Sequence, residues 1–166
     1  MLQGGIYDQL AGGFHRYATD RQWLIPHFEK MLYNQAQLAQ LYVRAWRLSG
    51  GMTDGNPEYR RICRETLDYV LREMQAENGA FYSATDADSE GQEGKFFVWS
   101  WHELAQRLTD AQLDLLKTVY GASQGGNFEG DNILFQPAPL TKAAARMGKS
   151  YQTLPDDIAL IKAVLY

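Results

Sequence analysis

The stretch "HFEKMLYNQAQLAQLYVRAWRL", residues 27–48, carries the clearest periodic pattern in the chain. Its apolar residues recur at intervals of three and four, at Leu32, Ala36, Ala39, Val43 and Trp46. Such spacing places apolar side chains along one face of an α-helix, and the proline just before the stretch suits a first helical turn. The sequence therefore predicts a helix over residues 27–48 and, with it, a mainly α fold.

More helices are expected on both sides of this one. A glycine-rich turn at residues 49–57 ends it, and the apolar positions that follow predict a second helix over residues 58–75. The pair Asn78-Gly79 is expected to close that helix with a left-handed cap, and residues 1–11 resemble the end of a helix. Shorter helices are predicted at residues 101–108, with a capping box of Ser100 and Glu103, at 110–120, with a capping box of Thr109 and Gln112, and at 141–146 and 155–166.

Between these helices the period of the pattern changes. Two short aromatic runs, "GAFYSA" at residues 79–84 and "KFFVWS" at 95–100, flank the acidic stretch "TDADSEGQEG". Aromatic runs on either side of turn residues favour two paired strands, and a further short strand is predicted at residues 132–135. We therefore expect paired helices, arranged as helical hairpins, with one small β-hairpin inserted.

Composition excludes several classes of function. A chain of 166 residues suits a single domain, and 13% aromatic residues suit a large core or an aromatic-lined pocket. The net charge of −4 argues against a nucleic-acid partner, which requires a clustered basic surface. No apolar run is long enough to span a membrane, no signal peptide is apparent, and Cys63 has no partner for a disulfide. We expect a cytoplasmic protein without a cofactor or membrane partner.

The polar segment before the first helix is the first candidate site. His15 and Arg16 follow a pair of glycines, and His27 with Glu29 stands next to Pro26. A histidine, an arginine and a carboxylate meeting in one concavity would suit proton transfer beside a carbonyl group. The spacing alone does not bring them together, and a lone histidine more often has a structural role. Zinc is not expected, because no HxxxH or HExxH spacing occurs.

The acidic stretch is the second candidate site. Asp86, Asp88 and Glu90 occupy positions 1, 3 and 5 of a loop that resembles an EF-hand, but Phe97 stands where the bidentate glutamate is required. Three interpretations remain open: a calcium site of another geometry, turn chemistry in a hairpin, or carboxylates that accept hydrogen bonds from the hydroxyls of a sugar. We predict no metal site here.

Three long motifs together resemble a known family. They are "GGIYDQLAGGFHRYATDRQWLIPHFEKMLY", "GAFYSATDADSEGQEGKFFVW" and "GNFEGDNIL", in this order. This chain is similar to the spermatogenesis-associated protein 20-like family, also known as thioredoxin domain-containing proteins or domain of unknown function 255. The resemblance implies a thioredoxin-like domain followed by an (α/α)6 toroid similar to N-acylglucosamine 2-epimerases and six-hairpin glycosidases. Residues 1–166 would then be a single domain, a fragment of that toroid without the thioredoxin-like domain and the remaining hairpins.

The resemblance also implies a pocket at one face of the toroid. It assigns catalytic roles to His15, Arg16 and His27. It assigns substrate binding to Tyr17, Asp20, Trp23, Glu29, Lys30, Asp86, Asp88 and Glu90. Two positions depart from the commonest family pattern, Asn34 and Thr85, where an acid is frequent, and the first departure puts a proton-transfer role at that position in doubt.

The expected function is binding of, or action on, a carbohydrate-like small molecule, by epimerase-like or hydrolase-like chemistry. One alternative is a non-catalytic accessory domain that serves a thioredoxin-like redox or chaperone partner domain. Another is that the motif residues form a structural network that holds loops to helices. Uncovered helix faces would favour self-association.

Overall fold

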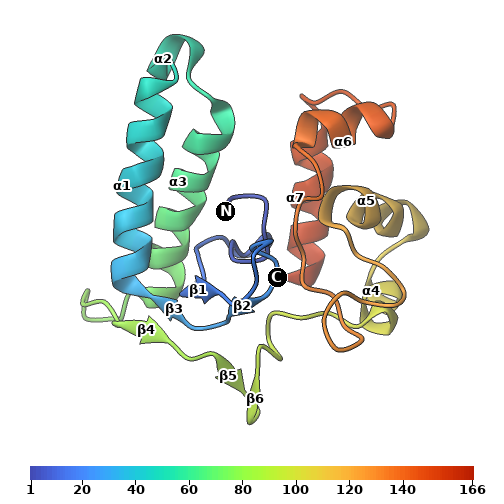
Figure 1. Ribbon diagram of the computed structural model, residues 1–166, viewed down its shortest axis with the longest axis horizontal. Coiled ribbons are helices and arrows are strands. Elements are labelled where there is room, and N and C mark those ends of the chain that lie inside the picture. Colours follow the sequence, from blue (N-terminus) through green and yellow to red (C-terminus); the bar gives the residue numbers. More distant parts are fainter.

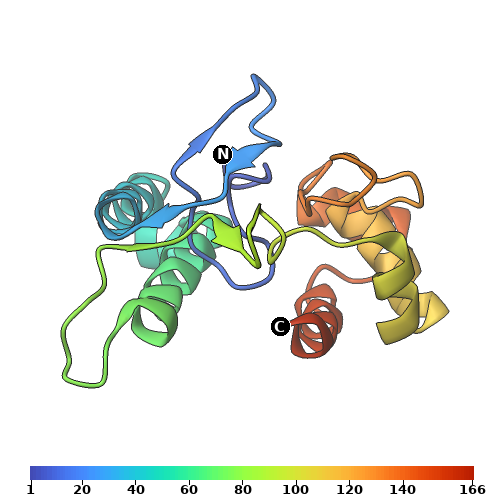
Figure 2. The same cartoon turned by 90° about the horizontal axis from the view of Figure 1, so that it is seen from below.

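The computed structural model describes residues 1–166 and is mainly helical, which confirms the predicted class (Figure 1). Seven α-helices make up most of the ordered structure, and the strands are each two residues long. In Figures 1 and 2 the helices form two groups, which we call the first and second lobes, with the N-terminal loop segment between them. None of the helices combines the length and the hydropathy that crossing a bilayer requires.

The first lobe is a helical hairpin. Helix α1, Leu32–Leu48, runs antiparallel to α3, Pro57–Tyr69, and the short α2, Gly51–Asp54, joins them (Figure 1). Asn56 caps α3 by accepting a hydrogen bond from the Glu58 amide. The chain continues from α3 into a π-helical turn, Val70–Met74. The predicted helix over residues 58–75 is thus confirmed, and it is the partner of the first predicted helix.

The second lobe holds the largest hydrophobic core. It contains α4, Trp101–Arg107, α5, Asp110–Tyr120, α6, Leu140–Arg146, and α7, Leu154–Leu165. Sixteen buried apolar residues from these helices and their connections form one cluster. Both predicted capping boxes are present, Ser100 with Glu103 on α4 and Thr109 with Gln112 on α5. All four helices were predicted, and the capping boxes of α4 and α5 are local signals that fix where those two helices begin.

Two pairs of short antiparallel strands hold the loop segment between the lobes, and a third pair forms the acidic hairpin. Strand β1, Tyr17–Ala18, pairs with β2, Pro26–His27, and β3, Lys30–Met31, pairs with β4, Ala84–Thr85. Strand β5, Asp88–Ser89, pairs with β6, Gln92–Glu93. Backbone contacts attach the loop segment to the second lobe as well, since the Gln136 amide donates to the Gln3 carbonyl.

The predicted start of the first helix is wrong. Helix α1 begins at Leu32, and residues 26–31 are extended. Along this segment burial alternates, with Phe28 and Lys30 buried and His27 and Glu29 partly exposed, which is the period of a strand. The prediction that residues 1–11 end a helix is also wrong, because that segment forms turns and Tyr7 pairs with Phe14 in an isolated bridge.

The predicted hairpin between the two aromatic runs is wrong as well. "GAFYSA" supplies β4, which pairs with β3, and its Phe81 forms a bridge with Gln75. The other run lies against a different segment, through an isolated bridge between Trp99 and Asn132. The strand predicted at residues 132–135 does not form beyond that bridge. Only the acidic tip forms a hairpin, β5–β6, turning at Glu90 and Gly91 with φ of 52° and 76°. Long-range pairing with β3 outcompetes the local pairing that the sequence favours.

The Asn78-Gly79 pair does not cap the second helix. The π-helical turn ends at Met74, and the backbone is already extended at Gln75. Gly79, with φ of 82°, instead closes a turn in which its amide donates to the Ala76 carbonyl. The pair therefore belongs to the loop that leads into β4.

Candidate functional site

His15 lies at the centre of the candidate site. Its side chain is almost fully buried, and its ring packs edge-on against Phe28 and Phe97 at centroid distances of 5.3 and 4.7 Å. Burial, aided by the charge of Lys30, lowers the pKa of His15 to about 3. The neutral ring bonds the Phe28 carbonyl through Nδ1, at 2.8 Å. The carbonyl can only accept, so Nδ1 carries the proton and Nε2 is an acceptor with no hydrogen-bond partner in the protein.

The glycines before His15 allow this close packing. Gly12 and Gly13 both have φ of 78°, a region that other residues rarely adopt. A Cβ on Gly13 would lie 2.7 Å from the Tyr69 ring of α3. From α1, Gln35 clamps the next residue, since its Oε1 accepts from the Phe14 amide at 2.8 Å and its Nε2 donates to the Phe14 carbonyl at 2.6 Å. The backbone at His15 is therefore held by both helices of the first lobe.

Lys30 is a buried structural cation. Its side chain is 0% exposed, and Nζ lies 2.7 Å from Asp8 Oδ2 and 3.0 Å from the Gly12 carbonyl. The ammonium also sits 4.0 Å from the centre of the Tyr69 ring. Burial alone would raise the pKa of Asp8. The charge and the hydrogen bond of Lys30 act in the opposite direction, and the pKa of Asp8 lies below its usual value. Lys30, predicted to bind substrate, lines neither of the two cavities described below and instead ties the glycine loop to the strand region.

A charged network lies on the surface next to this buried pair. Arg16 donates to Glu29 at 2.8 Å, and His27 Nε2 lies 3.5 Å from the same carboxylate. On its other side, His27 Nδ1 is 2.6 Å from Glu93 of β6. The ring of Tyr17 stacks on His27 at 5.0 Å. His27 thus joins the segment before α1 to the acidic hairpin, but it lines neither of the two cavities described below.

One cavity gathers the predicted site residues. It has a volume of about 520 Å³ and lies between the β1–β2 loop and α1; we call it the rim cavity. Five of the eleven predicted residues line it: His15, Arg16, Tyr17, Asp20 and Trp23. Asn34, which stands where the family frequently has an acid, lines it too. The other lining side chains include Gln37 and the apolar residues Met1, Ile6, Leu38 and Leu41.

The polar groups of the rim cavity differ in how many of their hydrogen bonds are already made within the protein. Both oxygens of Asp20 are already occupied by its own loop, because they accept from the amides of Gln22 and Ile25 at 2.8 and 2.7 Å. Asn34 donates Nδ2 to the Arg16 carbonyl at 2.9 Å, which leaves its Oδ1 free to accept. Trp23 and Tyr17 are 43% and 49% exposed, so their rings are accessible. Trp23 has a left-handed backbone, with φ of 63°.

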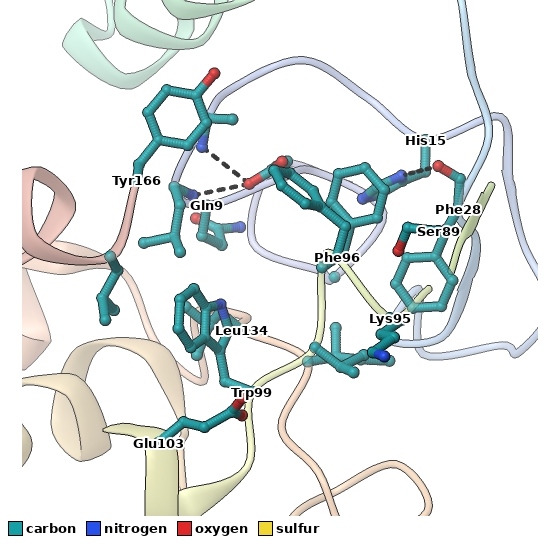
Figure 3. A pocket seen from close by; sticks show the side chains of 18 of the residues that line it. Gln9, His15, Phe28, Ser89, Lys95, Phe96, Trp99, Glu103, Leu134 and Tyr166 are labelled. Carbon is teal, nitrogen blue, oxygen red and sulfur yellow. Dashed lines mark hydrogen bonds between the residues drawn. The ribbon is translucent and has the colours of Figure 1, made fainter. Parts of the chain in front are cut away.

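A second cavity, of about 430 Å³, lies between the N-terminal loop, the segment 95–99 and the second lobe (Figure 3). We call it the interlobe cavity. His15 also lines this cavity, with Phe28, Phe96, Phe97 and Trp99 among its aromatic walls. Glu90 is the other predicted site residue in its lining, and that carboxylate is paired with Lys95.

The remaining acidic residues line neither cavity. Asp86 accepts from the Asp88 amide at 3.1 Å, which is turn chemistry, and Asp88 lies exposed on β5. Nowhere in the chain do three or more His, Cys, Asp or Glu side chains form a group that could hold a metal ion. The acidic hairpin thus touches the site through Glu93, which bonds His27, and through Glu90.

Three side chains to which the sequence assigned no role hold this arrangement together: Asp8, Gln35 and Glu93. Asp8 had a signal, because it is the only charged residue before Arg16 in a stretch rich in glycine and apolar residues. An isolated charge in such a stretch suggests a buried partner. Gln35 had none, since it resembles the exposed Gln37 and Gln40 of the same helix. The role of Glu93 depends on a contact across 66 residues.

Fold and site together define a class: a mainly helical domain whose polar loop is held between two helical lobes, with His15 in the walls of two cavities. No family model matches the chain. The chain is homologous to a segment of spermatogenesis-associated protein 20, with 41% identity to the human protein and 40% to the mouse protein, each over 89% of this chain. An uncharacterized protein of Caenorhabditis elegans is 33% identical over 76% of it. The chain spans about a fifth of the length of these relatives, 21% of the mammalian proteins and 19% of the nematode protein.

Proposed function

We propose that this domain binds a carbohydrate-like small molecule in the rim cavity. The observation that carries the proposal is the state of His15, which is buried and neutral, is fixed through Nδ1, and keeps Nε2 without a protein partner. Among buried side-chain atoms only Arg61 Nε and Gln136 Oε1 lack a partner, so His15 Nε2 keeps some exposure and a ligand can reach it. A ligand hydroxyl that donates to this nitrogen would satisfy it.

The other walls of the rim cavity suit a polyhydroxylated ligand. Sugars present apolar C–H faces as well as hydroxyls, and an accessible ring such as that of Trp23 or Tyr17 can cover such a face. The free Oδ1 of Asn34 and the guanidinium of Arg16 supply an acceptor and donors at the same cavity. A volume of about 520 Å³ is in the range of small-molecule sites.

The chemistry that we infer is epimerase-like or hydrolase-like. Neutral His15 would accept a hydrogen bond at Nε2 from the reacting hydroxyl and hold it in place, since a pKa of about 3 makes the ring a weak base, and Arg16 would stabilise negative charge that develops on an oxygen. His27 would act as a positioning residue, since it stacks on Tyr17 and shares Glu29 with Arg16. In this proposal the α1–α3 hairpin belongs to a partial (α/α)6 toroid, the fold that the family resemblance implies.

Calorimetric titration with a panel of mono- and disaccharides tests the proposal. We expect at least one sugar to bind, and Trp23→Ala to weaken it about tenfold through loss of the stacking surface. Tyr82→Ala is the matched control, because Tyr82 is an exposed aromatic residue that lines neither the rim cavity nor the cavity between the N-terminal loop and the second lobe. It should leave the affinity unchanged.

Two results would contradict the proposal. If no sugar produces heat, the accessory function beside a thioredoxin-like domain becomes the better explanation. If a sugar binds but Trp23→Ala and Tyr82→Ala behave alike, the ligand does not occupy the rim cavity.

A further inference from the structure

We infer that the interlobe cavity is a second ligand site, for a planar aromatic molecule with one negatively charged group. This inference does not rest on the proposed function, because it concerns a different cavity and a different ligand chemistry. It follows from three features of the cavity: its volume, its aromatic walls and the one charged side chain in its lining that has no bonded partner.

The cavity has the size and composition of a small-molecule site. Its volume is about 430 Å³, and 12 of the 21 residues that line it are hydrophobic. Sites for small molecules are usually apolar concavities with a few polar groups that fix the orientation of the ligand. Figure 3 shows that its lining comes from segments far apart in sequence, with Gln9 and His15, Phe96 and Trp99, and Leu134 and Tyr166 around one space.

The walls favour an aromatic ligand in particular. The rings of Phe28 and Phe97 are stacked, with centroids 5.7 Å apart and planes 9° apart. Phe96 meets Phe97 edge-to-face at 5.2 Å, yet its side chain is 65% exposed. A flat ring bound in the cavity would extend this series of aromatic contacts and cover Phe96.

The charge of the ligand follows from the pairing of the lining side chains. Asp8 is paired with Lys30, Glu90 is paired with Lys95, and Glu103 accepts two hydrogen bonds from Ser100. These partners leave one ionised lining side chain without a bonded partner.

That side chain is Arg107, on the last turn of α4. It makes no hydrogen bond, and no carboxylate oxygen lies within 4 Å of its guanidinium nitrogens, although Glu103 stands one turn away. Its guanidinium carbon lies 5.9 Å from the centre of the Trp99 ring, next to the aromatic wall. A carboxylate or sulfonate on a bound aromatic ring would therefore have a bidentate partner in reach.

A pair of fluorescent probes tests the inference. Anilinonaphthalene sulfonate has a planar aromatic system with one sulfonate, and N-phenyl-naphthylamine has the same rings without the charge. We expect the sulfonate probe to bind with a Kd on the order of tens of micromolar, the range expected for a ligand of its size. The uncharged probe should bind about tenfold more weakly, because it cannot pair with Arg107.

Variants locate the bound probe. Arg107→Gln should weaken the sulfonate probe about tenfold and leave the uncharged probe unchanged, whereas Phe96→Ala should weaken both. Arg146→Gln removes an exposed arginine of α6 that lines neither the interlobe cavity nor the rim cavity and should change neither affinity. Trp23→Ala, which alters the rim cavity, should also leave both affinities unchanged. Circular dichroism on each variant establishes that it is folded.

Three outcomes would overturn the inference. Equal affinities for the two probes would remove the need for an anion. An unchanged affinity of the sulfonate probe in both Arg107→Gln and Phe96→Ala would place that probe elsewhere on the protein. Displacement of the probe by laurate but not by naphthoate would show that the cavity takes aliphatic rather than aromatic anions.

Discussion

Replacement of Lys30 by methionine should be among the most destabilising single changes in this protein. The ammonium of Lys30 is fully buried, 2.7 Å from Asp8 and 3.0 Å from the Gly12 carbonyl. Methionine has a similar length and apolar character, so it fills most of the space. What Lys30→Met removes is the cation, and Asp8 then remains almost buried, with its side chain 11% exposed and no counterion.

The expected magnitude follows from this geometry. Removing one partner of a buried ion pair costs about 3–5 kcal/mol, because the other charge stays buried. For a domain of this size, 1 kcal/mol corresponds to a change in Tm of about 2–4 °C. We therefore expect Lys30→Met to lower Tm by about 10 °C.

A second substitution should recover part of this loss. Asp8→Asn retains the oxygen that accepts from the amides of Leu10 and Ala11, but it removes the charge. In the Lys30→Met background it should therefore raise the free energy of unfolding, although in the native background it breaks the ion pair and lowers it. Lys142→Met, at an exposed lysine, is the control and should change the free energy of unfolding by less than about 0.5 kcal/mol.

The dependence on pH gives a separate check with a definite sign. In the native protein Lys30 holds the pKa of Asp8 below its unfolded value, so this pair stabilises the fold above that value and the contribution is lost as pH falls. In Lys30→Met, burial without a cation should raise the pKa of Asp8 instead. The deficit of the variant should then shrink between pH 7 and pH 4, as measured by urea denaturation. A deficit below about 1 kcal/mol, or one that is the same at both pH values, would refute this reasoning.

Three further predictions concern His15 and the residues that hold its surroundings in place. The pKa of His15 is about 3 instead of 6.5, so the unfolded state binds more protons below pH 6.5, and stability should fall by about 1.4 kcal/mol per pH unit from 6.5 toward 3. His15→Gln should flatten that part of the stability curve, and NMR should show a neutral His15 ring at pH 5. Gln35→Leu should cost about 2–4 kcal/mol in urea denaturation, because it leaves the amide and carbonyl of Phe14 unpaired. Gly94→Ala should cost at least about 1–2 kcal/mol and change the near-ultraviolet circular dichroism, since φ there is 76° and the new Cβ would collide with the ring of Phe28.

The helices could be predicted from sequence to the extent that their signals are local. The start of α4 depends on Ser100 and Glu103, three residues apart, and both sides of that capping box are present. The start of α1 depends on tertiary contacts instead. Pro26 would suit a first helical turn, but an extended segment lets Phe28 and Lys30 enter the interior, and this burial outweighs the local preference. The sequence does not show the alternation in burial from Pro26 to Lys30, because the charged Lys30 occupies a buried position where an apolar residue would be expected.

The candidate site could be predicted in part for a related reason. The first motif contains the predicted residues of one segment, and that segment does supply His15 and its neighbours to the rim cavity. The partners that set the state of each side chain lie elsewhere in the sequence. Asp8 and Lys30 are 22 residues apart, and His27 and Glu93 are 66 apart, so no pattern of spacing connects them.

The strand period of residues 26–30 explains how one short segment serves both structure and site. Successive side chains of an extended backbone point in opposite directions. Phe28 and Lys30 therefore point inward, where the Phe28 carbonyl fixes His15 and the Lys30 ammonium holds Asp8 and the glycine loop. His27 and Glu29 point outward, where they stack on Tyr17 and pair with Arg16 at the edge of the rim cavity. A helix over the same residues would mix the two sets on neighbouring faces, so the extended backbone is what separates the buried framework from the groups that can meet a ligand.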